Sequence, residues 1–423
     1  MHLRAKERVA GRKQGLFYGW WVAATAALGL FLSAGSIVVL SFGVFFKPLS
    51  QDFHAGRTAI SLAFSLNSLI AAITIPLIGR LIDRFGARRV ILIGTALFTM
   101  VLLSSEFVGS HIASLYIFFA VLGAVNGTTS PVPYGVVVSR WFDKRRGLAL
   151  GLMAIGLGLG AILMPLFAQR LIAMFGWRGA YAIFGGAAAL LTLPLVGAFL
   201  LESPAQKGLR PDGTPFNEKQ QPTQMDQQGL SWRDTWHQPT FWLLIGAFSL
   251  AAAGLLGCIV HLPTIVADRG GSAQNAAVAS SVIGIALLIG RFGAGYLLDR
   301  FFAPRLAMIF FGGAALGFTL LLAGSSGILA LAAAFLLGLG MGSEVDIMAF
   351  LMSRYFGLRS LGTAFGFGFG SYILAGAVGA LIMGAGFDTT HSYALPLEGF
   401  LFAMLVAIVV MARLGPYRYA PQS

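Results

Sequence analysis

The chain has 423 residues, of which 57% are hydrophobic and only 11% are charged, whereas an ordinary soluble protein carries about 25% charged residues. Apolar runs long enough to cross a bilayer recur from end to end, which excludes a soluble fold and predicts an all-α membrane protein surrounded by lipid. The net charge of +13 gives no reason to expect a nucleic-acid partner, because most Lys and Arg lie at the termini and in alternate loops, as the positive-inside rule requires.

Taken in order, the chain begins with a basic flank, residues 1–17, which we expect in the cytoplasm. Two groups of six apolar runs follow, in residues 18–201 and 240–413, and a polar segment, 202–239, separates them as a flexible cytoplasmic linker. An even number of spans returns the tail, 414–423, to the cytoplasmic side of the cell (inner) membrane. The twelve predicted transmembrane spans are 18–46, 58–79, 90–107, 113–138, 147–170, 178–201, 240–264, 273–298, 306–323, 327–352, 361–384 and 395–413.

The two groups repeat each other. The segment 79–89 after the second span, GRLIDRFGARR, returns after the eighth span as GYLLDRFFAPR at 295–305. Likewise SRWF at 139–142 after the fourth span returns as SRYF at 353–356 after the tenth. A six-plus-six parallel repeat is typical of a secondary transporter whose halves rock about a central site.

The segment 79–89 also resembles the signature loop of the major facilitator superfamily, which implies that superfamily's twelve-helix fold and transport by alternating access. Its glycine allows two helix ends to approach closely, and Asp83 can interact with the positive N-terminus of a neighbouring helix. We therefore expect a gate made of the residues that the repeat shares, and the alternative is a plain turn with stop-transfer charges. The candidate gating residues are Gly79, Asp83, Arg84, Arg88, Asp299 and Arg300.

An arginine interrupts the eighth span. Arg291 lies eight residues before Asp299, so it sits roughly 12 Å inside the end of the helix, within the hydrocarbon zone. A charge there is costly, and we expect it to face a water-filled cavity and to bind an anionic substrate. The alternative is a structural ion pair.

Several motifs narrow the resemblance to the monocarboxylate transporters. They are Tyr18-Gly-Trp-Trp and Phe42-Gly-Val-Phe-Phe in the first span, and Arg146-Gly-Leu-Ala-Leu-Gly and Phe175-Gly-Trp-Arg at the two ends of the fifth. Oxalate/formate antiporters share similar features, and the linker segment 208–213 resembles that group too. Both families hold a carboxylate with an arginine in span eight, and Arg291 matches it.

The chain also departs from these families. The first-span lysine of the mammalian monocarboxylate transporters is Leu40 here, and their span-eight aspartate is Leu287. The span-eleven lysine of the oxalate transporter has no counterpart, because no lysine lies between Arg359 and Arg413. A single central cation favours a monocarboxylate over a dicarboxylate.

Two carboxylates in the tenth span are candidates for proton coupling. Glu344 and Asp346 lie roughly 15 and 12 Å inside the end of their helix, close to the depth of Arg291, and need partners or protons there. Aligning the repeats pairs Glu344 with Ser130, which belongs to an expected polar stripe of Asn126, Ser130 and Tyr134 on the fourth span. We therefore expect Glu344 to face the cavity near Arg291 and to be protonated when substrate binds. The alternative is that both acids are structural.

The remaining substrate-binding candidates are His261, at the outer end of span seven, and Tyr372, in span eleven. Neither a phosphate-binding loop nor a metal-ligand cluster occurs, so we expect no cofactor, no ATP and no enzymatic activity. The sequence thus predicts a monomeric secondary transporter that moves a small organic anion, most simply a monocarboxylate, together with a proton. Two alternatives are an oxalate/formate-type antiporter and a non-transporting membrane sensor or receptor.

Overall fold

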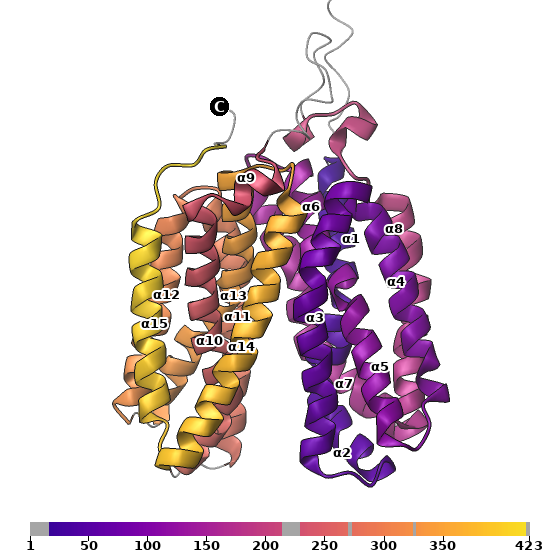
Figure 1. Cartoon of the computed structure of the whole chain (residues 1–423), viewed down its shortest axis with the longest axis vertical. Helices are drawn as coiled ribbons and strands as arrows, with labels where there is room; N and C mark the ends of the chain where they lie inside the picture. Colours follow the sequence, from indigo (N-terminus) through magenta and orange to yellow (C-terminus); the bar gives the residue numbers. More distant parts are fainter. Residues whose placement is uncertain (1–16, 214–228, 270–272, 325–326, 420–423) are drawn as a thin grey trace, which may run out of the picture.

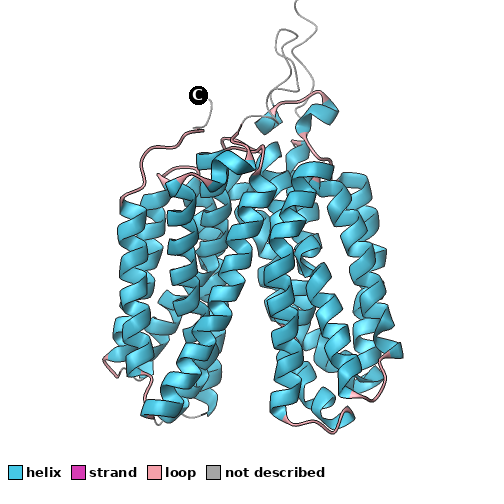
Figure 2. Cartoon of the chain, viewed as in Figure 1, coloured by secondary structure: helices cyan, strands magenta, loops and turns pink. Residues whose placement is uncertain are grey.

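The computed structural model describes residues 17–213, 229–269, 273–324 and 327–419, and this part of the chain is helical (Figure 2). The first half contains α1 (Tyr18–Phe31), α2 (Phe42–Asp52), α3 (Arg57–Phe85), α4 (Ala87–Leu103), α5 (Ile112–Asn126), α6 (Pro131–Trp141), α7 (Arg146–Ala187) and α8 (Leu193–Phe199). After the short α9 (Trp232–Trp236), the second half contains α10 (Pro239–Asp268), α11 (Ala273–Leu298), α12 (Ala303–Leu322), α13 (Gly327–Phe356), α14 (Leu361–Thr390) and α15 (Ala394–Ala412). Almost all of the predicted N-terminal flank, the middle of the linker and the last four residues of the tail lie outside the described residues.

Within the described residues, eleven segments are long and apolar enough to cross a membrane. One of them, Arg146–Phe199, has 54 residues, which would make a straight helix roughly 80 Å long against a membrane core of about 30 Å. Its backbone turns at Gly176, where φ is 70°, a conformation that favours glycine. The segment therefore holds two crossings, which brings the count to the predicted twelve.

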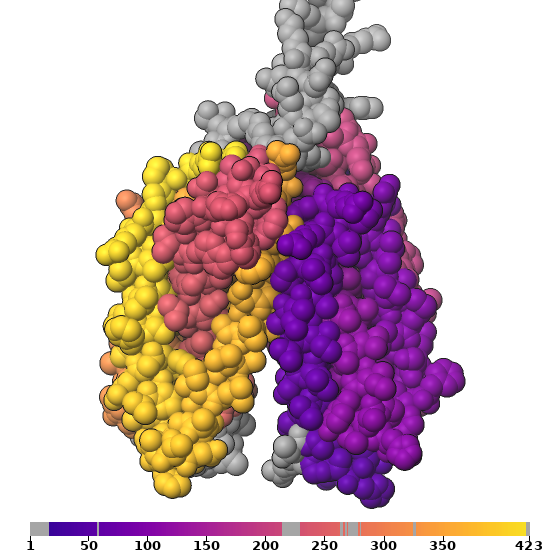
Figure 3. All heavy atoms as spheres, in the orientation of Figure 1, coloured from indigo at the N-terminus to yellow at the C-terminus, as the bar shows by residue number. Residues whose placement is uncertain are grey.

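The helices form two bundles that meet at one end of the molecule (Figure 1). We call this end the linker face, because α9 and the described ends of the linker lie there, and the opposite end the far face. Between the bundles, α3 packs against α14 and α7 packs against α11. Toward the far face the bundles separate, and the space-filling view shows an open cleft between them (Figure 3).

Glycines allow the close contact between the bundles near the linker face. A side chain on Gly79 of α3 would collide with the carbonyl of Gly362 in α14. On the other side, a Cβ on Gly147 of α7 would lie 2.6 Å from the carbonyl oxygen of Gly295 in α11. The absence of side chains at these positions is what permits backbone-to-backbone contact in the membrane.

The fourth span is not the continuous helix that the sequence predicts. It divides into α5, a 3₁₀ turn over Gly127–Thr129, and α6. Ser130 is extended, with ψ of 172°, and caps α6 by accepting a hydrogen bond from the Val132 amide at 3.3 Å. Pro131 explains the break, because the residue before a proline is driven out of the helical region.

The described ends of the linker are ordered and docked, in contrast to the expected flexible segment. In the first half, Asp212 Oδ2 accepts hydrogen bonds from the backbone amides of Asp143 (3.1 Å) and Lys144 (2.8 Å). In the second half, the Leu230 amide donates to the Phe356 carbonyl at 2.8 Å. Each end of the linker thus binds the bundle next to it.

Candidate functional site

Arg291 lies on the helix of the second half that packs against α7 of the first half. It belongs to α11, at the point where this helix packs against Gly151 of α7, and it is only 5% exposed. Its Nη1 atom lies 3.8 Å from Oδ1 of Asp346 in α13, which is 2% exposed. The arginine that interrupts the eighth span therefore has an anionic neighbour within its own half.

The contact between Arg291 and Asp346 leaves polar atoms unsatisfied. A separation of 3.8 Å is too long for a hydrogen bond. Arg291 Nε and Asp346 Oδ2 are buried and form no hydrogen bond with any residue that the structure describes. Unsatisfied buried groups are uncommon and costly in native proteins, and they are found at functional sites. This arrangement can accept a ligand carboxylate, whose two oxygens match the fork of a guanidinium group.

The described ionic neighbour of Arg291 is Asp346, whereas the sequence favoured Glu344 for that position. Gly342 of α13 packs on the carbonyl of Leu287 in α11, and Asp346 lies one turn later on the same face. By contrast, a Cβ on Gly340 would lie 3.2 Å from the Cβ of Ala314 in α12. Glu344 lies one turn after Gly340 and is fully buried, and neither of its carboxyl oxygens has a hydrogen-bond partner among the described residues.

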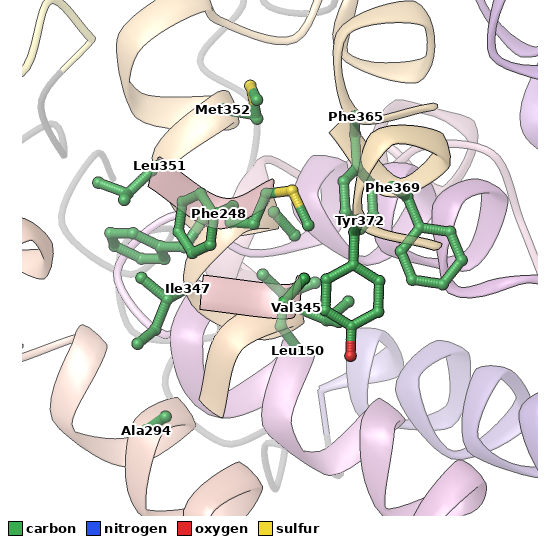
Figure 4. Packing of buried hydrophobic residues seen from close by; sticks show 14 of the residues in the cluster. Leu150, Phe248, Ala294, Val345, Ile347, Leu351, Met352, Phe365, Phe369 and Tyr372 are labelled. Carbon is green, nitrogen blue, oxygen red and sulfur yellow. The ribbon is translucent and has the colours of Figure 1, made fainter. Parts of the chain in front are cut away.

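Tyr372 joins this cluster from α14. It is 8% exposed, and its hydroxyl is close enough to Glu344, Arg291 and Asp346 for electrostatic interaction with each. Its ring stacks on Phe369, with centroids 5.7 Å apart and planes 9° from parallel. In the close-up, the hydroxyl points away from the rings of Phe365 and Phe369 (Figure 4). The cluster therefore combines a cation, two acids and a hydroxyl donor.

The other substrate-binding candidates lie elsewhere. Asn126 ends α5 and Ser130 caps α6, so they do not share one helical face with Tyr134. The Tyr134 hydroxyl is fully buried against Gly29 of α1, inside the first half. The Nδ1 atom of His261 lies 3.1 Å from the Gly257 carbonyl of its own helix. Of the six candidates, the structure brings Arg291 and Tyr372 together.

At the linker face, two aspartates bridge the bundles. Asp83 of α3 accepts hydrogen bonds from the backbone amides of Gly362 (2.9 Å) and Thr363 (2.7 Å), at the start of α14. The repeat-related Asp299 accepts from the amides of Gly147 (2.6 Å) and Leu148 (2.8 Å), at the start of α7. Each acid thus meets the positive end of a helix in the other half.

Burial changes the acidity of Asp299. Desolvation raises the pKa of this carboxyl to about 6, although the bonds from Leu148 and Gly147 and the nearby Arg354 act in the opposite direction. Desolvation disfavours the charged form of an acid, whereas hydrogen-bond donors stabilise it. The pKa of Asp299 therefore lies well above that of an aspartate in water in this conformation.

The arginines of the predicted gate stay within their own halves. Arg84 and Arg300 are exposed and lie over the rings of Phe85 and Tyr296, at 5.1 and 4.1 Å. Arg88 donates from Nη2 to the carbonyl of Gly197, in α8 of the first half. None of these described contacts joins one bundle to the other.

Sequence reasoning missed a third bridge at the linker face. Arg354, at the end of α13, donates from Nη1 to Oδ1 of Asp143, in the loop before α7, at 2.6 Å. Arg146 lies 3.4 Å from the same oxygen and donates to Ser353 Oγ at 2.9 Å. The signal in the sequence is the Ser-Arg pair that recurs at 139–140 and 353–354.

Comparison with known proteins agrees with this architecture. The family model of the Major Facilitator Superfamily matches residues 24–380. Monocarboxylate transporter 11 of Mus musculus is 28% identical over 295 residues, which are 69% of this chain and 62% of that protein. The chain thus spans about three fifths of that relative. The uncharacterised transporter YcxA of Bacillus subtilis is 26% identical and is matched over 84% of this chain and 85% of its own length.

Solved structures share the fold at low sequence identity. The proton:xylose symporter XylE matches with a TM-score of 0.70 and 15% identity, over 95% of this chain and 97% of its own. The Escherichia coli fucose:proton symporter FucP matches with a TM-score of 0.68 and 15% identity, over 94% and 99%. With a family match over most of its length and this fold, the chain belongs to the Major Facilitator Superfamily of multi-pass membrane transporters.

Proposed function

We propose that this transporter moves a small monocarboxylate together with a proton, and that Arg291 binds the carboxylate. The observation that carries the proposal is the loose pair of Arg291 on α11 and Asp346 on α13, both buried, in which one nitrogen and one oxygen have no hydrogen-bond partner among the described residues. The similarity to monocarboxylate transporters supports this substrate class.

Charge balance supplies the coupling. In the empty transporter, Arg291 and Asp346 neutralise each other at 3.8 Å. An incoming carboxylate that binds Arg291 leaves Asp346 as a second, unpaired anion, and an unpaired buried charge is costly. Protonation of Asp346 removes that charge, so one anion and one proton enter together. Tyr372 lies within electrostatic reach and is the candidate hydroxyl donor to the bound carboxylate.

The conformation fits one step of alternating access. If the basic linker face is cytoplasmic, the cleft of Figure 3 opens toward the outside. The bonds of Asp83 and Asp299 to helix starts in the opposite half then form the closed inner gate. These bonds join the two bundles, so they must break when the inner side opens.

Uptake into proteoliposomes tests the proposal. Purified protein is reconstituted, and uptake of radiolabelled monocarboxylates is measured with and without an inward proton gradient. We expect the gradient to stimulate uptake. Arg291→Lys keeps the charge but loses the two-pronged geometry, and the loss of a charge-assisted hydrogen bond, about 1.5–3 kcal/mol, predicts roughly 10- to 100-fold weaker binding. Exposed Arg170 on α7 provides the control Arg170→Lys, which should transport normally.

Two results would contradict the proposal. Normal affinity in Arg291→Lys would show that the arginine does not bind the carboxylate. Uptake would favour the antiporter instead if it did not depend on the proton gradient and required a carboxylate inside the vesicle.

A further inference from the structure

The repeated arginine after the fourth and tenth spans behaves differently in the two halves. In the first half, Arg140 forms an ion pair with Glu202, which follows α8. Glu202 also caps α4, because its two carboxylate oxygens accept hydrogen bonds from the amides of Ala87 (2.9 Å) and Arg88 (2.8 Å). Arg140 is thereby bound inside its own bundle.

In the second half, a tyrosine occupies the corresponding place. Tyr417 follows the last helix of this half, and its hydroxyl accepts a hydrogen bond from the amide of Ala303, in the first turn of α12, at 2.6 Å. Ala303 aligns with Ala87 in the repeated segments 295–305 and 79–89. Glu202 and Tyr417 thus cap equivalent helices, but only the glutamate carries a charge that can bind an arginine.

Among the described residues of its own half, Arg354, the counterpart of Arg140, has no acid that caps α12 and pairs with it. The acid of that half that lies near it, Asp299, instead binds the start of α7 in the other half. Arg354 reaches across the interface, where Nη1 donates to Asp143 Oδ1 at 2.6 Å and Nη2 to the Asp143 carbonyl at 2.5 Å. Its side chain is 2% exposed. Its guanidinium lies over the ring of Phe350 at 5.0 Å, and that ring contacts Tyr417, with centroids 6.3 Å apart. The tail also bonds this helix end, through the Tyr419 amide and the Arg354 carbonyl at 2.9 Å.

We propose that the neutral cap at Tyr417 leaves Arg354 free to bind Asp143, and so adds an ionic contact that holds the two halves together at the linker face. The device is asymmetric: one of the two repeated arginines stabilises its own bundle and the other joins the bundles. Tyr417 is a positioning residue here, because it acts through Arg354.

The proposal predicts that an acid at position 417 will reproduce the arrangement of the first half. In Tyr417→Glu, the carboxylate lies at the start of α12 and beside Arg354, as Glu202 lies at the start of α4 and beside Arg140. Arg354 then binds within its own half and releases Asp143. The linker face should open more often, without any substrate present.

Distance measurements between spin labels can detect this opening. Arg89 and Arg305 are exposed, repeat-related residues at the linker ends of α4 and α12, and cysteines there carry the labels after the single native Cys258 is replaced by Ala. In the detergent-solubilised full chain, Tyr417→Glu should increase the long-distance population, and Arg354→Gln should do the same. Tyr417→Gln is the matched control, with the shape of glutamate and no charge, and should retain the parent distribution.

The double variant of Tyr417→Glu with Arg354→Gln distinguishes an effect that acts through Arg354 from a packing defect. If Tyr417→Glu acts through Arg354, it adds no further opening to Arg354→Gln, because the two changes remove the same contact. Equal opening in Tyr417→Gln and Tyr417→Glu would overturn the role of charge at this position. An unchanged distribution in Arg354→Gln would overturn the contact itself. Because these measurements need no substrate, they are independent of the proposed transport activity.

Discussion

At the scale of single residues, the two acids of α13 divide into different chemical roles. Asp346 lies 3.8 Å from Arg291, whereas Glu344 is fully buried and lacks a hydrogen-bond partner on either oxygen. A carboxyl group without a partner in an apolar interior is stable only in its neutral, protonated form. Under the proposed function, we therefore expect Asp346 to take up the coupling proton and Glu344 to stay protonated throughout the cycle.

Asp346→Asn should convert net uptake into exchange. In this variant the empty transporter carries an unpaired Arg291, and breaking a buried pair costs about 3–5 kcal/mol. The return of the empty transporter should therefore slow by about 100-fold or more, whereas the loaded form, with Arg291 bound to a carboxylate, remains neutral. Proton-driven uptake and exchange of internal for external carboxylate are measured on the same vesicles. Full proton-driven uptake in Asp346→Asn would contradict this role.

Glu344→Gln is the companion change, because it replaces a neutral acid by a neutral amide of the same shape. We expect proton-driven uptake and exchange to stay within about twofold of the parent protein, since no charge is removed from the cluster. Uptake-driven alkalinisation outside the vesicles, measured with a pH dye, reports the coupling directly. Loss of alkalinisation with retained exchange would move the coupling proton to Glu344.

At the scale of helices, the sequence was sufficient to predict the features that depend on local patterns, such as periodicity and small residues. Apolar length located the crossings, and the repeated segment 79–89 identified Asp83 and Asp299. Prediction from the sequence failed at the fourth span, where Ser130 and Pro131 break the helix and so change the directions of the side chains that follow. Aligning an interrupted helix with the continuous α13 favoured Glu344, whereas the described neighbour of Arg291 is Asp346. Which acid approaches Arg291 depends on the face that α13 turns toward α11. Such a rotation is set by packing between distant segments.

The contact between α3 and α14 gives a prediction about an element. Gly79→Val should hinder closure of the linker face, because its side chain would collide with the Gly362 carbonyl across the interface. Leu150 is fully buried beside Gly135 and Phe365. In Leu150→Cys, made in the Cys258→Ala background, the reactivity of the introduced thiol therefore reports whether the linker face is closed. We expect its labelling by a soluble maleimide in detergent to rise severalfold.

Gly293→Val in α11 is the matched control, since a Cβ there has no atom within 4 Å. Its labelling should equal that of the parent. The same labelling in Gly79→Val and the parent would show that α3 and α14 do not need a glycine contact to close.

At the scale of the whole molecule, the interface between the halves is concentrated at one end. Asp83, Asp299 and Arg354 each bond the opposite half at the linker face, while the far face is open (Figure 3). Rocking the two bundles would exchange these bonds for contacts at the far face. The balance between the two states therefore depends on the groups at the linker face that change their solvation when it opens.

Asp299 should make that balance depend on pH. Burial in the closed linker face raises its pKa to about 6, from 3.8 in water. Opening exposes the carboxyl and returns its pKa toward the lower value. Between these two values the closed state binds more protons than the open state, so acidification stabilises closure, and this stabilisation is lost as the pH rises through about 6. Arg354 lowers the pKa of Asp299, and Asp212 raises it. Both groups are present in the parent and in the variant described below.

The spin-label pair at positions 89 and 305 measures this effect between pH 4.5 and about 7.5. In the parent, the long-distance population should grow as the pH is raised through about 6. In Asp299→Asn, position 299 no longer titrates, so the growth in this range should shrink, and the difference between the two curves isolates the contribution of Asp299. Identical curves would show that the carboxyl keeps the same solvation in both states. A parent that opens on acidification would mean that the closed state binds Asp299 mainly as the anion, with the helix start of α7 outweighing the cost of burial.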